Sequence, residues 1–298
     1  MLHTIQNDLL TCSVSSNGSE IRSLKKKETD KEYIWQIDES VWASSSPVLF
    51  PAIGKIKGDK ITYNGKDYAM TKHGIIRHND DMLFEQHSDS KCSFTLNSSP
   101  ETLVKYPFMF SFTVVYELVS NQLKMTYHIK NKGDVPMYFS CGGHTAYACP
   151  LTNGKKLEDY VIEFPNGKSL KAVTLGDSGL LSDEIRKIPI ENSALPLSKT
   201  LFDRDALIFV NVDYDWVRLR ACLPDRQESG KNKGLMVKFE GYPNLALWSK
   251  PGADYVCIEP WLGLPDSEDE STEISEKSSY QSIAAGSQFS ITITTIVE

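Results

Sequence analysis

The chain has 298 residues, of which 40% are hydrophobic and 24% are charged, as is typical of a globular protein with a large core. Its net charge of −7 and its pI near 5.5 argue against nucleic acid as a partner, because binding phosphate requires a basic face. Neither a signal peptide nor an apolar run of about 18 residues is visible, so we expect a cytoplasmic protein that does not enter a membrane.

Alternation of apolar and polar residues with a period of two dominates the chain, and helical periods are nearly absent. Strands are predicted at residues 10–14, 20–24, 60–63, 66–68, 110–118, 123–129, 160–164, 206–212, 216–222, 235–239, 255–258 and 289–297. Asn64-Gly65 supplies the positive-φ positions of a type I′ hairpin turn. Residues 110–118 and 123–129 each have one apolar face that must be buried against another sheet. We therefore predict an all-β fold, a large antiparallel β-sandwich that forms a single domain over residues 1–298.

One segment departs from this pattern. Residues 266–279 are acidic and rich in serine, and they precede the last predicted strands. We interpret this segment as a solvated loop, and a binding tail is the alternative.

The cysteines and histidines show none of the spacings that hold a metal. C-x-x-C, H-x-H and H-E-x-x-H are all missing, so the sequence predicts no metal site. The chain has six cysteines: Cys12, Cys92, Cys141, Cys149, Cys222 and Cys257. Most of them lie in apolar surroundings, so they are expected to be reduced and buried.

Glu259 is the first candidate for chemistry. It follows the apolar run 255–258, which predicts a buried strand, and it precedes Pro260, which is expected to end that strand. Trp248 and Trp261 flank it and offer flat apolar surfaces to the C–H faces of a sugar. The alternative is a surface glutamate at a strand end, paired with a lysine.

Two histidines stand beside glycines in predicted loops. His73 precedes Gly74, which permits a close approach of the backbone, and His144 follows Gly142 and Gly143. Such positions suit exposed rings held by a scaffold, although a structural histidine is the alternative for each. No Gly-x-Ser-x-Gly elbow and no Walker loop is present, so one carboxylate and two imidazoles remain, a set suited to general acid–base catalysis.

An ordered set of motifs resembles the aldose 1-epimerase (galactose mutarotase-like) family from about residue 45 to the C-terminus. The motifs are Pro-Val-Leu-Phe-Pro at 47–51, Gly-Lys at 54–55, Lys-His-Gly at 72–74, Gly-His-Thr at 143–145, residues 201–209, and the block 247–261. The resemblance implies a supersandwich of antiparallel sheets with a sugar cleft, in an enzyme that needs no cofactor.

The resemblance also implies roles for individual residues. Glu259 corresponds to the general base that takes the proton of the anomeric hydroxyl, and His144 to the general acid that protonates the ring oxygen. His73 corresponds to a histidine that hydrogen-bonds the sugar. Asp205 corresponds to a substrate-binding aspartate, with Asp203 as the alternative.

The expected activity is the interconversion of α and β anomers of an aldohexose by a monomer or homodimer. Lys55 stands where many relatives carry arginine, so contacts to the sugar are expected to differ there. Arg77, Arg204 and Lys250 are cationic candidates for binding a phosphate group. Two alternatives therefore stay open: an epimerase of hexose 6-phosphates, and a non-catalytic sugar-binding or sensor protein.

Overall fold

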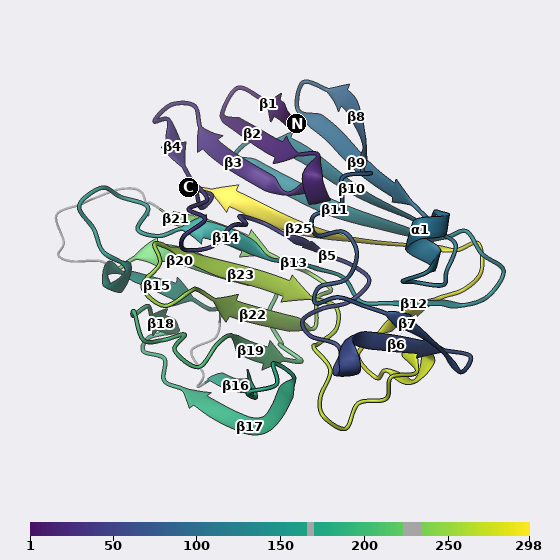
Figure 1. Cartoon of the computed structure of the whole chain (residues 1–298). Helices are drawn as coiled ribbons and strands as arrows, with labels where there is room; N and C mark the ends of the chain where they lie inside the picture. The colour runs from purple at the N-terminus through teal and green to yellow at the C-terminus, as the bar shows by residue number, and fades with distance from the viewer. Residues whose placement is uncertain (166–169, 223–233) are drawn as a thin grey trace.

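The computed structural model describes residues 1–165, 170–222 and 234–298, and its regular structure there is almost entirely antiparallel β-sheet (Figure 1). The helical elements of this part are short: α1 (Pro100–Leu103), η1 (Asn17–Ser19), η2 (Lys57–Asp59), η3 (Leu157–Asp159) and η4 (Ile274–Glu276). No helix among the described residues is long and apolar enough to cross a membrane.

Two large sheets hold most of the strand residues of the described part. The first has nine strands, in the order β18 (Ala194–Pro196), β15 (Tyr160–Glu163), β20 (Trp216–Ala221), β21 (Gly234–Lys238), β25 (Gln288–Val297), β11 (Gln122–Asn131), β10 (Phe110–Val119), β9 (Lys91–Asn97) and β8 (Leu83–Ser88). The second has eight, in the order β17 (Leu181–Ile188), β16 (Leu170–Leu175), β19 (Leu207–Val210), β22 (Asn244–Trp248), β23 (Tyr255–Trp261), β13 (Gly142–Gly143) and β5 (Val48–Leu49), with β14 (Thr145–Ala148) also paired to β23.

The other strands of the described part form three smaller sheets. A four-stranded sheet holds β1 (Leu2–Gln6), β2 (Leu10–Ser15), β3 (Ile21–Lys26) and β4 (Lys31–Glu32). Two-stranded sheets join β6 (Lys60–Tyr63) to β7 (Lys66–Ala69), and β12 (Met137–Phe139) to β24 (Gln281–Ile283). The predicted hairpin turn at Asn64-Gly65 is confirmed, since both residues have positive φ.

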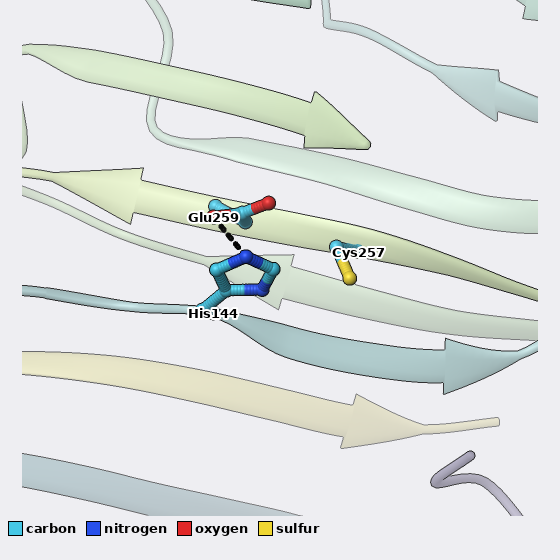
Figure 2. Close-up of side chains that lie close together, drawn as sticks. All are labelled: His144, Cys257 and Glu259. Carbon is cyan, nitrogen blue, oxygen red and sulfur yellow. Dashed lines mark ion pairs between the residues drawn. The ribbon is translucent and has the colours of Figure 1, made fainter. Parts of the chain in front are cut away.

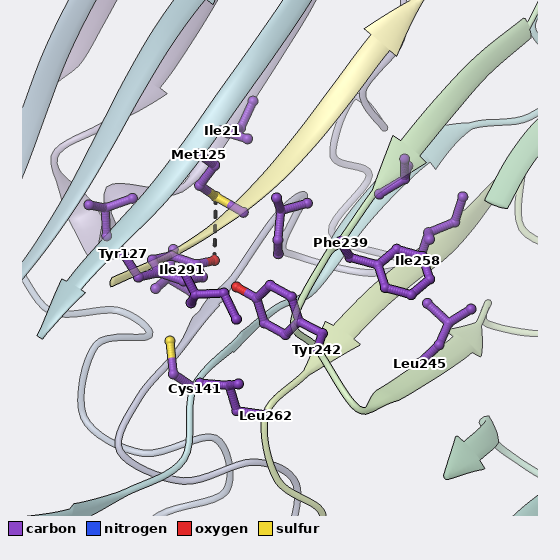
Figure 3. Packing of buried hydrophobic residues seen from close by; sticks show 14 of the residues in the cluster. Ile21, Met125, Tyr127, Cys141, Phe239, Tyr242, Leu245, Ile258, Leu262 and Ile291 are labelled. Carbon is purple, nitrogen blue, oxygen red and sulfur yellow. Dashed lines mark hydrogen bonds between the residues drawn. The ribbon is translucent and has the colours of Figure 1, made fainter. Parts of the chain in front are cut away.

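The main core lies between the two large sheets. The predicted pair of long strands is β10 and β11, and every apolar residue of its alternating face is buried, from Phe110 to Leu118 and from Leu123 to Ile129. These residues share one cluster with Leu245 and Ile258 of the second sheet, and Figure 3 shows side chains from both sheets meeting there. Because each buried apolar side chain contributes about 1.5–3 kcal/mol, this interface dominates the stability. The predicted antiparallel sandwich is confirmed.

Alternation along β22 and β23 gives the second sheet two different faces. Leu245, Leu247 and Ile258 point into the main core, whereas Ala246 and Cys257 belong to small apolar clusters on the opposite face. Side chains on that opposite face are held by a fully packed sheet without being part of the main core. This is where the candidate site lies.

The expectation that β23 ends before Pro260 is wrong. The strand continues to Trp261, so Glu259 lies inside it and not at its mouth, and the side chain of Glu259 is only 1% exposed. Pro260 lies opposite Gly143, the last residue of β13, when the register of β14 and β23 is continued, and the neighbouring edge is interrupted directly after it, between β13 and β14. A missing N–H costs no ladder hydrogen bond at such an interruption.

The interpretation of residues 266–279 as a solvated loop is also wrong in part. Asp266, Ile274 and Lys277 are buried within this segment, and Lys277 Nζ binds Asp266 Oδ2 at 2.6 Å. The same carboxylate oxygen accepts a hydrogen bond from the backbone N–H of Lys57 at 2.9 Å. An internal ion pair therefore ties down a segment whose remaining acidic residues reach solvent.

Candidate functional site

His144 and Glu259 face each other across adjacent strands of the second sheet. Thr145 of β14 pairs with Ile258 of β23, so the next position in the same register places His144 opposite Glu259. His144 Nε2 lies 3.4 Å from Glu259 Oε2, and the two side chains are 11% and 1% exposed (Figure 2). His144 and Glu259 are 115 positions apart in the sequence, yet they form a cross-strand pair. Residues directly opposite each other on neighbouring strands are close enough for their side chains to interact.

The backbone around His144 fits this close approach. A Cβ on Gly142 would lie 2.7 Å from the carbonyl oxygen of Pro260, so only glycine lets the two strands meet there. The backbone N–H of His144 donates to the carbonyl oxygen of Pro47 at 3.1 Å and not to β23. The interruption of the ladder thus leaves no unpaired N–H at His144.

His73 approaches the same pair from a tight loop. His73 and Gly74 both have positive φ, and a Cβ on Gly74 would lie 2.2 Å from the carbonyl oxygen of Phe50, which confirms the expected close approach. The backbone N–H of Gly54 donates to His73 Nδ1 at 3.2 Å. Because Nδ1 accepts this bond, the neutral ring carries its proton on Nε2. The two imidazole centroids are 5.5 Å apart, edge to face.

Burial keeps all three of these groups close to neutral. It lowers the pKa of His144 to about 3, with the nearby charges of Arg77 and Lys72 acting in the same direction. Burial likewise holds the pKa of His73 well below its ordinary value. The pKa of Glu259 is raised well above its ordinary value by burial, against an opposing effect of Lys72. Burial therefore favours the uncharged form of both partners, a protonated carboxyl group on Glu259 and a neutral imidazole on His144.

The remaining predicted charged residues occupy different positions. Asp205 raises the pKa of Glu259 and has positive φ in the turn before β19, whereas no such effect on Glu259 comes from Asp203. The positive charge of Arg77 lowers the pKa of His73 and of His144. Arg77 Nη2 lies 3.4 Å from Ser44 Oγ. Lys55 is half-buried and follows Gly54; its side chain lies near Gly179, since a Cβ there would be 3.4 Å from Lys55 Cδ.

Two of the cationic candidates already bind other groups of the protein. Arg204 forms an ion pair with Glu184 on the exposed surface of β17. Lys250 Nζ donates to the carbonyl oxygen of Val41 at 2.6 Å. Only Arg77, of the three cations named for phosphate binding, changes the pKa of the site histidines.

Aromatic rings surround His144. Trp248 was predicted from the sequence, and its ring centroid lies 5.7 Å from that of His144. Trp42 was missed, although its ring stacks on His144 at 5.2 Å and on Tyr255 at 5.4 Å. The loop that carries Trp42 is tied down because Trp35 Nε1 donates to the Trp42 carbonyl at 3.3 Å. The irregular segment around Trp42 has no period or motif that could have placed it here.

Trp261, also predicted, is buried in a neighbouring apolar cluster that includes Leu49 and Ile208. The indole lowers the pKa of Glu259, which favours the charged form of the carboxyl group. The indole N–H nevertheless completes no hydrogen bond with any of the described residues.

The same face carries one thiol. All six cysteines are free, and all except Cys222 are buried, as predicted for most of them. Cys257 lies two positions before Glu259 on β23, and donor atoms of His144, Cys257 and Glu259 all lie within 4.8 Å of one another. These three residues are the only group in the described part of the chain with the spacing to hold a metal ion.

Comparison with known proteins adds a consistent picture. Residues 1–261 match the model of the aldose 1-epimerase family. The chain is 30% identical over 282 residues to the chromosomal protein LacX of Lactococcus lactis subsp. lactis, which is 92% of this chain and 91% of that protein. A solved galactose mutarotase related enzyme from Lactobacillus acidophilus is 32% identical with a TM-score of 0.91, covering 100% of this chain and 97% of its own. A galactose mutarotase-like protein from Lactobacillus casei has 27% identity and a TM-score of 0.89, over 100% of both chains.

Proposed function

Because the chain belongs to the aldose 1-epimerase family, we propose that it interconverts the α and β anomers of an aldohexose, with Glu259 as general base and His144 as general acid. The observation that carries this proposal is the cross-strand pair, in which an imidazole nitrogen and a carboxylate oxygen lie 3.4 Å apart on the face away from the main core. Both are nearly buried, as proton-transfer groups with displaced pKa values commonly are.

The reaction needs one group that accepts a proton and a second group that donates a proton. Glu259 takes the proton of the anomeric hydroxyl while His144 gives one to the ring oxygen, and the bond between C1 and the ring oxygen breaks. Rotation about C1–C2 then presents the other face of the carbonyl group, and the same groups close the ring with their roles reversed. The products contain the same atoms and electrons as the substrate, so this scheme requires no cofactor.

The resting proton must move before this step. In the free protein burial leaves the proton on Glu259 and the imidazole of His144 neutral. A sugar hydroxyl that donates a hydrogen bond to Glu259 favours the carboxylate, and a ring oxygen that accepts one favours a protonated imidazole. Substrate binding therefore drives the pair into its reactive form.

The residues around the pair would hold the sugar. His73 offers a proton on Nε2, and Asp205 and Arg77 offer an acceptor and donors for hydroxyl groups. Lys55 is proposed for the same purpose. Apolar faces of the sugar would lie against aromatic rings, as such rings commonly bind sugar C–H groups: Trp42, Trp248 and Trp261.

A phosphorylated aldohexose is the second candidate, and one observation favours it. Lys72 and Arg77 both place positive charge on the site, and Arg77 forms no ion pair with a carboxylate within 4.0 Å among the described residues. Glu20 is the carboxylate whose charge acts on Arg77, but Glu20 forms its ion pair with Arg22. A guanidinium that forms no ion pair is suited to a phosphate oxygen.

Polarimetry distinguishes these functions. Freshly dissolved α-galactose, α-glucose and their 6-phosphates should each be followed with and without protein, with the spontaneous rate subtracted. Acceleration that is lost in Glu259→Gln supports the proposal, and the sugar with the largest kcat/KM identifies the substrate class. If neither form of either sugar is accelerated while binding is detected by calorimetry, the protein is a sugar-binding protein and the enzymatic proposal is wrong.

A further inference from the structure

The thiol of Cys257 has no part in the proposed reaction, yet it lies beside both groups that do. From this juxtaposition we propose that His144, Cys257 and Glu259 form an inhibitory binding site for a thiophilic divalent cation, of which Zn²⁺ is the representative. The inhibitory effect rests on the proposed function, because the cation would occupy the acid and the base together. Binding of the cation itself does not depend on that function.

The geometry is close to that of a tetrahedral site. Cys257 and Glu259 are two positions apart on β23, so their side chains leave the same face of the strand, and His144 lies opposite them (Figure 2). Zinc bonds of about 2.0–2.3 Å in a tetrahedron place ligand atoms about 3.3–3.8 Å apart. The separation of 3.4 Å between His144 Nε2 and Glu259 Oε2 already lies in that range. No pair of donor atoms exceeds 4.8 Å, so shifts of about 1 Å at rotatable side chains complete the site.

The donor atoms are available for coordination. Glu259 Oε2 accepts no hydrogen bond within the described residues although its side chain is only 1% exposed. A buried carboxylate oxygen without a donor is an unsatisfied acceptor, and a cation would satisfy it. Burial raises the pKa of the Cys257 thiol and of the Glu259 carboxyl group, so binding of the cation releases both protons to solvent. The resulting thiolate and carboxylate balance the two positive charges of the ion, and Asp205 adds attraction against the repulsion of Lys72 and Arg77.

The ligand set selects the type of cation. One sulfur, one nitrogen and one oxygen suit Zn²⁺ and its neighbours, whereas Mg²⁺ prefers oxygen ligands in octahedral geometry. Three protein ligands leave one position for water. Bound Zn²⁺ would use the lone pairs of His144 and Glu259 that the reaction needs, so inhibition should be relieved by a chelator and weakened by high sugar concentrations.

The test uses the full chain, freed of metal with a chelator and then titrated with ZnCl₂, CoCl₂ or MgCl₂. We expect Co²⁺ to give the near-ultraviolet thiolate charge-transfer band and the intense visible bands of a tetrahedral site. Zn²⁺ should displace Co²⁺ and inhibit anomer interconversion, whereas Mg²⁺ should do neither. In Cys257→Ala, and in Cys257→Ser if the alanine variant folds poorly, the thiolate band should vanish. The Zn²⁺ concentration for half-inhibition, with each variant compared to its own metal-free rate, should rise at least about tenfold.

Cys222→Ala is the matched control, because Cys222 is the only cysteine that is not buried, and this variant should behave as the wild type does. Equal inhibition of the Cys257 variants and the wild type would overturn the proposal, as would a thiolate band that survives removal of Cys257. The cobalt spectra require no sugar turnover. They therefore decide the metal site even if no sugar tested is a substrate.

Discussion

Replacing Glu259 by glutamine is expected to make the protein more stable near neutral pH while removing its catalytic base. Glutamine keeps the shape of the side chain, but it does not ionise. The carboxyl group of Glu259 is buried and its pKa is raised well above the ordinary value of 4.5, so holding it in the folded state carries a free-energy cost once the unfolded chain ionises. The variant avoids that cost.

The sign of the pH dependence follows from proton counts. Between pH 4.5 and the raised pKa, folded Glu259 holds a proton that the unfolded chain has lost, so wild-type stability falls as pH rises. His144 acts in the opposite direction between pH 3 and 6.5, because its folded pKa is lowered to about 3. Between pH 4.5 and 6.5 the effects of Glu259 and His144 cancel in the wild type, and above pH 6.5 the Glu259 effect remains. The lowered pKa of His73 makes stability rise with pH as His144 does, and it does so equally in both proteins. In Glu259→Gln the rises due to His144 and His73 remain.

The stability difference should therefore grow with pH, by up to about 1.4 kcal/mol per pH unit above pH 4.5 until the raised pKa is reached. Urea unfolding followed by tryptophan fluorescence at pH 5, 6, 7 and 8 measures the free energy of unfolding of both proteins. At pH 7, 2.5 pH units above 4.5, the variant should be more stable by at least about 1 kcal/mol and by up to about 3.5 kcal/mol.

Asp266→Asn is the matched control, because Asp266 is also a buried carboxylate but is paired with Lys277. Removing one partner of a buried ion pair leaves the other uncompensated, so this variant should lose about 3–5 kcal/mol. If Glu259→Gln is instead less stable at pH 8 than the wild type, or if its advantage shrinks as pH rises, then Glu259 is ionised in the folded protein and the reasoning fails.

Other variants test the remaining parts of the site. His144→Asn should lower kcat by about 10²–10⁴-fold in the polarimetric assay, and an unchanged rate would remove His144 as the acid. Trp42→Ala should lower kcat/KM about tenfold, the equivalent of about 1.4 kcal/mol of ring contact, whereas Trp42→Phe should keep most of it; equal rates in both would show that the ring does not contact the sugar. Gly74→Ala should lower the free energy of unfolding by at least about 1 kcal/mol more than Gly65→Ala, because both glycines have positive φ but only Gly74 meets backbone atoms; equal losses would contradict the close contact.

Local patterns predicted what depends on neighbours in the sequence. The alternation in β10 and β11 follows from one buried face, and the Asn64-Gly65 turn follows from its required dihedral angles. His144 and Glu259 could be selected as candidates because their flanking glycines and tryptophans are visible in the sequence. Their mutual distance could not, since it depends on the register between β14 and β23.

The errors have the same origin. Pro260 ends a strand only where its N–H is needed, and here the neighbouring edge is already interrupted. The acidic composition of residues 266–279 did not reveal that Asp266 pairs internally with Lys277. Trp42 reaches His144 through a loop without regular structure. Each case depends on a contact between segments distant in sequence, which composition and periodicity do not encode.

The interruption in the second sheet connects these observations. Pro260 lies opposite Gly143 when the register of β14 and β23 is continued, so the residue that cannot donate meets the residue without a side chain. In the same register, the next pair consists of Glu259 and His144, and it lies where the ladder is interrupted between β13 and β14. Any ordinary strand pair would fill that position with apolar side chains and gain stability. Retaining a buried, unsatisfied carboxyl oxygen there has a cost in folding free energy, and a group with this cost is expected where proton transfer, and not packing, determines which residue is kept.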